Sequence, residues 1–191
     1  MTTRIVGIGG TVHPGSSTEQ ALALALAVAA DAGAETTMFG GEYLRALPHY
    51  RGEGYGIEDG AELVEAVRQA DGLIISAPGY HGSISGLLKN ALDYLEDLAK
   101  DERPYLDGRA VGLIATAYGD QATMSTLLTM RSVVHALRGW PTPMGATVRV
   151  YHGLFSPDGE CLEDRARMQI ELVGRQTFRG ACALSLAGNR E

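Results

Sequence analysis

The chain has 191 residues, of which 45% are hydrophobic and 20% charged, and this composition is typical of one globular domain rather than a disordered segment. The formal net charge of −7 argues against nucleic acid or an anionic membrane as a partner, because both bind basic surfaces. Two cysteines are too few for a disulfide framework or a zinc site, whereas the 25 glycines are an excess that needs an explanation.

Apolar runs and helical patterns alternate about five times along the chain. We expect strands at residues 5–8, 35–39, 72–77, 109–116 and 146–151, and helices at residues 18–32, 59–70, 87–98, 122–137 and 162–186. Residues 40–60 hold six glycines and three tyrosines without a clear period, so we expect a mobile, irregular connection there. The alternation predicts a single α/β domain over residues 1–191, with a doubly wound five-stranded parallel sheet in a three-layer α/β/α arrangement.

Two apolar segments near the start of the sequence are too short for targeting or membrane insertion. The run Ile5–Ile8 is shorter than the hydrophobic region of a signal peptide, and Ala21–Ala30 has about half the length that spans a bilayer. Cys161 and Cys182 are then best explained as small apolar residues in a reducing compartment. We therefore expect a cytoplasmic protein.

The loop between the first predicted strand and helix, residues 10–18, is the first candidate site. It ends in Ser16, Ser17 and Thr18 where a helix begins, and the free N–H groups and helix dipole there favour an anion. Ser16 replaces the lysine of a Walker A loop, and the third glycine of a dinucleotide fingerprint is missing, so we expect a phosphate site of neutral donors. The alternative is that Ser17 or Thr18 only caps the helix.

Two further loops combine glycine and tyrosine after the third and fourth predicted strands. Residues 78–86 contain glycines that let backbone approach a flat ligand, and Tyr80 offers an aromatic face. Residues 117–120 repeat the arrangement with Tyr118 and Gly119. For each loop alone, the alternative is ordinary turn packing. Because all three loops lie at the carboxyl edge of one parallel sheet, together they indicate a planar ring with a single phosphate, and FMN fits that description.

The sequence resembles the NADPH-dependent FMN reductase family of flavodoxin-like proteins. The first loop of that family reads roughly G-S-x-R-x-x-S-x-N, and the residues in those places here are Gly10, Thr11, His13, Ser16 and Thr18. Its second loop and helix read roughly P-x-Y-N-G-S-x-x-G-x-L-K-N-A-x-D, matched here by Pro78, Tyr80, Gly82, Ser83, Gly86, Leu88, Lys89, Asn90, Ala91 and Asp93. The resemblance covers about residues 4–150 and implies the flavodoxin-like strand order 2-1-3-4-5.

Four positions depart from the family pattern. His13 stands where arginine is usual, which weakens one charge-assisted contact to a phosphate or makes it pH-dependent. Thr11 replaces serine but keeps a hydroxyl, Gly79 replaces a larger residue beside the ring, and His81 replaces asparagine. None of these changes removes the binding scheme, because backbone N–H groups supply most of it.

The resemblance implies an NAD(P)H-dependent flavin oxidoreductase, in which hydride passes from NADPH or NADH to N5 of FMN and onward to an acceptor. The flavin carries the hydride, so no catalytic side chain and no metal ligand are expected. Backbone N–H groups from Gly79 to Ser83 are expected at the polar edge of the ring, with Tyr118 and Gly119 near its other side. The candidate cofactor-binding residues are Gly10, Thr11, His13, Ser16, Ser17, Thr18, Pro78, Gly79, Tyr80, His81, Gly82, Ser83, Tyr118, Gly119 and Asp120.

The resemblance also implies a subunit partner and an electron acceptor, but it does not decide the oligomeric state or the identity of the acceptor. A homodimer or homotetramer is expected, with Leu127, Met130, Val134 and Leu137 of helix 122–137 either at the interface or packed on the sheet. The acceptor is free flavin or a flavin-dependent monooxygenase. The alternatives are a quinone, azo or metal-ion reductase with bound FMN, and a flavodoxin-type electron carrier that does not oxidise NAD(P)H. Arg51 is a candidate contact for the NADPH phosphate, although the preference between NADH and NADPH stays open.

Overall fold

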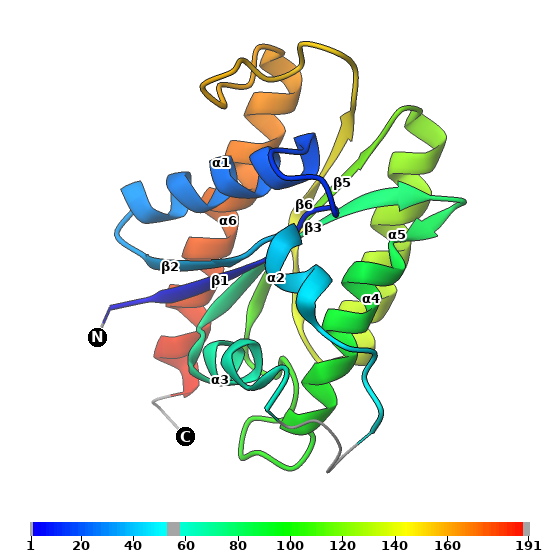
Figure 1. The fold of residues 1–191 in the computed structure, drawn as a ribbon. Coiled ribbons are helices and arrows are strands. Elements are labelled where there is room, and N and C mark those ends of the chain that lie inside the picture. Colours follow the sequence, from blue (N-terminus) through cyan, green and yellow to red (C-terminus); the bar gives the residue numbers. More distant parts are fainter. Residues whose placement is uncertain (1, 53–57, 189–191) are drawn as a thin grey trace.

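The computed structural model describes residues 2–52 and 58–188 of the chain. Five parallel strands form the sheet in the order β2-β1-β3-β5-β6 (Figure 1). Their bounds are β1 Arg4–Gly9, β2 Glu35–Phe39, β3 Gly72–Tyr80, β5 Ala110–Ala117 and β6 Trp140–Arg149. This is the expected doubly wound order. The sheet also has a sixth strand that we did not predict, β4 (Ser83–Ile84), which pairs antiparallel with the end of β3.

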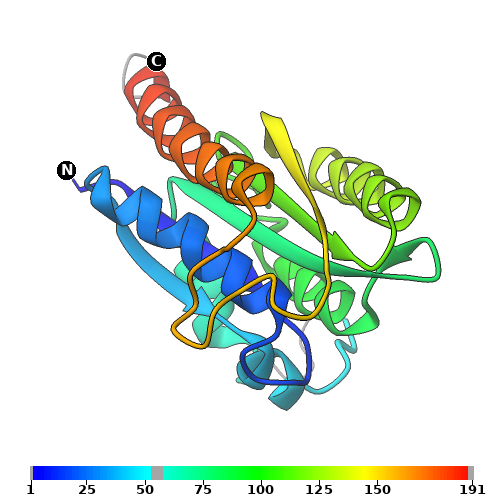
Figure 2. The ribbon, with the colours of Figure 1, turned by 90° about the horizontal axis from the view of Figure 1, so that it is seen from above.

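Helices cover both faces of the sheet (Figure 2). One face carries α1 (Ser17–Asp31) and α6 (Asp164–Gly188), and the other carries α3 (Ala61–Gln69), α4 (Gly86–Asp93) and α5 (Asp120–Ala136). Side chains alternate between the two resulting cores, so that Ile74 packs with α1 and α6 while Leu73 and Ile75 pack on the opposite face. The interior strand β5 is buried along its whole length, as expected for a parallel strand covered on both sides.

Several element boundaries differ from the sequence prediction. The predicted helix at residues 87–98 is α4 followed by a 3₁₀ turn, Tyr94–Leu98. The expected irregular connection at 40–60 contains a helix, α2 (Gly41–Ala46), so the expected lack of regular structure is wrong for that part, while the expected mobility stays a prediction. Gly54 and Gly56 of the same prediction lie outside the described residues.

The edge strand β6 begins at Trp140, earlier than predicted, and is protected by side chains from both flanking helices. Arg131 of α5 donates to the carbonyls of Thr142 and Pro143, at 3.3 and 3.0 Å. On the α6 side, glutamine side chains accept from the backbone N–H groups of two β6 residues, at 2.8 and 3.0 Å. These contacts, together with the prolines in β6, disfavour pairing of this edge with another strand.

Arg109 braces the amino end of the sheet, opposite to the carboxyl edge that the sequence analysis singled out. Its side chain is 1% exposed, and its guanidinium donates only to backbone carbonyls in the hydrogen bonds that the described residues give it. The acceptors are Ala70, Tyr105, Asp107 and Arg68, at 3.1, 3.1, 3.3 and 2.8 Å. Burial lowers the pKa of this guanidinium to about 10.

The expected interface residues on α5 pack on the sheet instead. Leu127, Met130 and Val134 are buried in the core, so their assignment to a subunit interface is wrong, and the alternative of sheet packing holds. The large apolar residues of α5 that are exposed are Met124 and Leu128. None of the helices in the described ranges is long and apolar enough to cross a membrane.

Candidate functional site

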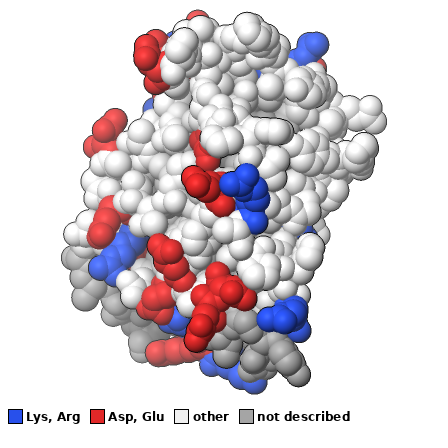
Figure 3. All heavy atoms as spheres, in the orientation of Figure 1, with Lys and Arg blue, Asp and Glu red and all other residues white. Residues whose placement is uncertain are grey.

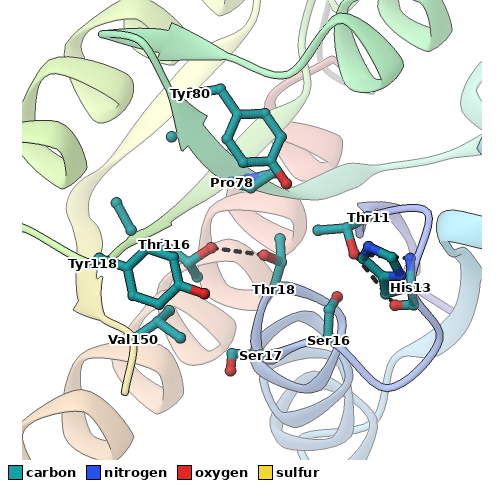
Figure 4. Close-up of a pocket in the computed structure, with 12 residues that line it drawn as sticks. Thr11, His13, Ser16, Ser17, Thr18, Pro78, Tyr80, Thr116, Tyr118 and Val150 are labelled. Carbon is teal, nitrogen blue, oxygen red and sulfur yellow. Dashed lines mark hydrogen bonds between the residues drawn. The ribbon is translucent and has the colours of Figure 1, made fainter. Parts of the chain in front are cut away.

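A cavity of about 340 Å³ lies at the carboxyl edge of the sheet, where the three predicted loops meet (Figure 4). Its volume is within the range of about 300–1,000 Å³ that is usual for small-molecule sites. The lining residues are Thr11, His13, Ser16, Ser17, Thr18, Pro78, Gly79, Tyr80, Thr116, Ala117, Tyr118 and Val150. This set contains no Lys, Arg, Asp or Glu.

The structure brings most of the sequence-predicted site residues to this cavity. Those that do not line it are Gly10, His81, Gly82, Ser83, Gly119 and Asp120. Thr116 and Ala117 at the end of β5 and Val150 directly after β6 also line the cavity but were not among the predicted binding residues, although Ala117 belongs to the predicted loop 117–120. A search of every residue at the carboxyl end of each predicted strand could have found them.

The start of α1 supplies the polar end of the cavity. Ser16 is the N-cap, and its Oγ accepts from the backbone N–H of Glu19 at 3.3 Å, so the alternative that Ser17 or Thr18 caps the helix is wrong. A hydroxyl that accepts this bond still has its own hydrogen to donate. The first backbone N–H groups of the helix have no intrahelical acceptor, which leaves them available to an anion.

Thr18 lines the cavity, and its hydroxyl forms a hydrogen bond within the protein. Its hydroxyl is buried and lies 2.7 Å from the hydroxyl of Thr116, which itself donates to the carbonyl of Ala77 at 3.4 Å. The hydroxyl of Ser76 donates to the carbonyl of Thr18 at 2.8 Å. The bond between Thr18 and Thr116 (Figure 4) ties the start of α1 to β5, and the bond from Ser76 ties it to β3. The contact of Thr18 with a phosphate stays a prediction.

The second predicted loop is a β-hairpin. Tyr80 pairs with Ser83, and the two residues between them, His81 and Gly82, have φ angles of 51° and 86°. Positive φ at both central residues is characteristic of a type I′ turn, which asparagine–glycine sequences favour. Gly82 therefore has a role in the turn and lies outside the lining of the cavity, and its expected role in ring approach stays a prediction.

Two other glycines make room for protein rather than for a ligand. A Cβ at Gly79 would lie 2.6 Å from Oγ1 of Thr126, so its missing side chain lets α5 pack against β3. A Cβ at Gly10 would lie 2.7 Å from the backbone nitrogen of Gly41, next to α2. Packing within the protein is thus sufficient to explain glycine at these two positions, and the expected close approach of FMN stays a prediction.

The aromatic side of the cavity is formed by two exposed tyrosines. Tyr80 is 52% and Tyr118 is 83% exposed, and both rings lie at the cavity (Figure 4). The carbonyl of Tyr118 accepts from Nε of Arg149 at 3.2 Å, and the N–H of Val150 donates to the carbonyl of Ala117 at 2.7 Å. These bonds hold the β5–α5 loop, while Gly119 caps α5 and Asp120 begins it.

The donor set fits FMN. Hydroxyls and free N–H groups at the start of α1 suit a phosphate, because the helix dipole offsets its charge without a cation. Pro78, Tyr80, Tyr118 and Val150 provide apolar surface for a flat ring. In Figure 3 the surface around the β3–β4 hairpin and the start of α5 carries few charged side chains, whereas acidic groups gather lower on this face.

The sequence matches a known family over most of its length. Residues 3–152 match the NADPH-dependent FMN reductase family. An NADPH azoreductase of Bacillus sp. (strain OY1-2) is 32% identical over 123 residues, which cover 63% of this chain and 64% of that protein. An FMN-dependent NADPH-azoreductase of Staphylococcus aureus is 39% identical over 82 residues, 43% of this chain and 40% of that protein. The chain thus spans less than two thirds of either relative.

Solved structures with the same fold cover nearly the whole chain. The flavoenzyme NAD(P)H:(acceptor) oxidoreductase FerB from Paracoccus denitrificans has a TM-score of 0.77 and 16% identity, and 96% of this chain and 98% of that one are covered. The apo form of the NADH:FMN oxidoreductase EMOB has a TM-score of 0.68 and 23% identity, with coverage of 95% and 90%. At these identities the likeness shows the fold. Because the family match extends over more than three quarters of the sequence, the chain belongs to the NADPH-dependent FMN reductase family.

Proposed function

We propose that this protein binds FMN in the cavity and acts as an NAD(P)H-dependent flavin oxidoreductase. The observation that carries the proposal is one cavity with an uncharged anion site at the start of α1 and two exposed tyrosines on its other side. Both halves are needed, because a phosphate site alone fits many ligands and an aromatic surface alone fits most flat ones. The family match supports the same ligand.

The residues of the chain bind and orient the cofactor. Ser16 and Ser17 donate to the phosphate together with the N–H groups of the first turn of α1. Tyr80 and Tyr118 cover apolar surface of the ring and exclude water from it. When bound, FMN supplies the redox chemistry, since its ring accepts a hydride from the nicotinamide and passes electrons to the acceptor. Among the twelve lining residues we assign no proton donor.

For the acceptor we favour a small aromatic azo compound over a protein partner. Two relatives are named as azoreductases, and the exposed rings of Tyr80 and Tyr118 offer a flat apolar surface that such a compound can stack on. Transfer of reduced flavin to a monooxygenase, or reduction of a quinone, is the competing role. Steady-state kinetics separates azo reduction from transfer of reduced flavin: ping-pong turnover of an azo dye with retained FMN supports our proposal, and release of reduced FMN contradicts it.

The proposal is tested by the absorbance of the FMN-loaded protein under anaerobic conditions. Addition of NADPH or NADH should bleach the visible flavin band within the dead time or over seconds. A protein that binds FMN but is not bleached by either nucleotide would be a flavodoxin-type electron carrier. A protein that does not bind added FMN would contradict the proposed site itself.

A second copy of the chain is the proposed partner. Met124 and Leu128 are exposed one turn apart on α5, beside the exposed Tyr118, which gives an apolar surface for a homodimer or homotetramer. Light scattering should show a dimer or tetramer that Leu128→Glu dissociates, and a wild-type monomer would contradict the assignment. The cytoplasmic location stays a prediction.

A further inference from the structure

Glu19 joins three segments of the chain beside the proposed phosphate site. It lies in the first turn of α1, and its Oε2 accepts from the backbone N–H of Gly15 at 2.9 Å. Its Oε1 accepts from the N–H of Gly41, the first residue of α2, at 3.0 Å. The loop after β1 and the start of α2 lie side by side at this point (Figures 1 and 2).

The surrounding residues fit this carboxylate closely. Gln20 donates through Nε2 to the carbonyl of Gly15 at 2.6 Å, so side chains of α1 hold both polar groups of that residue. A Cβ at Gly40 would collide with Oε1 of Glu19, and a Cβ at Gly41 would collide with the carbonyl oxygen of Thr11. The backbone contact makes glycine necessary at Gly41, whereas a side chain at Gly40 would displace the carboxylate of Glu19 from its present position.

The hydrogen bonds of the Glu19 carboxylate are not those of an ordinary helix cap. In a capping box the side chain three residues after the cap accepts from the N–H of the cap residue itself. Here Ser16 accepts from the N–H of Glu19, but the carboxylate of Glu19 extends past Ser16 to Gly15 and to α2. Its bonds thus shape the loop of residues 10–16 in addition to the helix start.

We infer that Glu19 is the positioning residue that shapes the phosphate-binding loop and so makes the protein prefer a phosphorylated flavin over riboflavin. This inference rests on the proposed function. A loop that is already ordered by Glu19 loses less conformational entropy when it closes around a phosphate. The charge of Glu19 acts in the opposite direction, because a carboxylate near a bound phosphate repels it.

Because loop ordering and charge repulsion change the affinity for FMN in opposite directions, the direction of the change in a Glu19 variant distinguishes them. Glu19→Gln removes the charge and leaves one acceptor oxygen for two N–H donors, so electrostatics alone predicts tighter binding of FMN. Positioning predicts that the dissociation constant for FMN rises about tenfold, equivalent to about 1.4 kcal/mol, while that for riboflavin stays within about twofold. Both constants are measured by quenching of flavin fluorescence, with thermal melts of the flavin-free proteins recorded alongside.

Glu171→Gln is the matched control. Glu171 is a half-buried glutamate on α6 that accepts from Arg175 at 3.1 Å, away from the loop. It should leave both dissociation constants unchanged. Should Glu19→Gln fold poorly, Glu19→Asp keeps the charge but is too short to reach both N–H groups, and the same loss of preference for FMN is expected.

The failures of the two proposals are distinguishable. Equal or tighter FMN binding by Glu19→Gln, or an equal loss for FMN and riboflavin, overturns the positioning role while the wild-type preference for FMN stands. A wild-type protein that binds FMN no better than riboflavin removes the phosphate site, and both proposals fall with it.

Discussion

Ser16 has two roles in this account, and two substitutions separate them. Its Oγ caps α1 by accepting from the N–H of Glu19, and its O–H is proposed to donate to the FMN phosphate. Ser16→Ala removes both, whereas Ser16→Gly removes the donor but leaves a residue that is nearly as good an N-cap. The pair therefore distinguishes loss of the helix cap from loss of the ligand contact.

The magnitudes follow from these two contacts. Loss of the cap should lower the free energy of unfolding of Ser16→Ala by about 1 kcal/mol, and that of Ser16→Gly by only a few tenths. Loss of a donor to a charged phosphate should weaken FMN binding by about 1–2 kcal/mol in both variants, a factor of about 5–30 in affinity. Urea denaturation without flavin measures the first quantity, and fluorescence titration with FMN the second.

Two patterns of results would contradict the roles assigned to Ser16. If both variants bind FMN as tightly as the wild type while only Ser16→Ala is less stable, Ser16 is a helix cap and the phosphate lies elsewhere. If Ser16→Gly loses stability as much as Ser16→Ala, the cap assignment is wrong.

Other substitutions test the remaining parts of the account. Arg109→Lys cannot satisfy four backbone carbonyls and should lower the free energy of unfolding in urea by about 2–4 kcal/mol, with unchanged FMN affinity because the site is at the opposite end of the sheet. Gly82→Val places a β-branched residue at φ 86° and should cost about 1–2 kcal/mol of stability; an unaffected melting temperature would contradict the type I′ turn. His13→Arg restores the charge usual in the family and should tighten FMN binding by about two- to fivefold at low salt, an advantage that should vanish at high salt if it is electrostatic.

The sheet and its main helices could be predicted because their signals are local. The runs at residues 72–75 and 110–115 are apolar throughout, which is the pattern of strands buried on both faces, and the structure buries both. The start of β6 was missed because Pro141 and Pro143 argue against a strand, although an edge strand tolerates proline. The short strand β4 was missed because a two-residue strand has no periodicity to detect.

The site was predicted as a set of loops, but the roles within it depend on contacts between segments far apart in the sequence. The sequence places Thr18 beside a loop as one of three neighbouring hydroxyls, but its hydrogen-bond partner Thr116 is 98 residues away. The missing side chain of Gly79 was interpreted as space for the flavin ring, but in the structure α5 occupies the position that a Cβ would take. Glu19 reads as an ordinary helix-start residue, and its bond to Gly41 becomes visible only when β1 and β2 are placed side by side.

The most direct test of the central claim is a crystal structure of the protein with FMN. We predict electron density for the phosphate at the start of α1, in contact with Ser16 and Ser17, and for the flavin ring beside Tyr80 and Tyr118. Density for the phosphate away from the start of α1, or for the ring away from both tyrosines, would contradict the account.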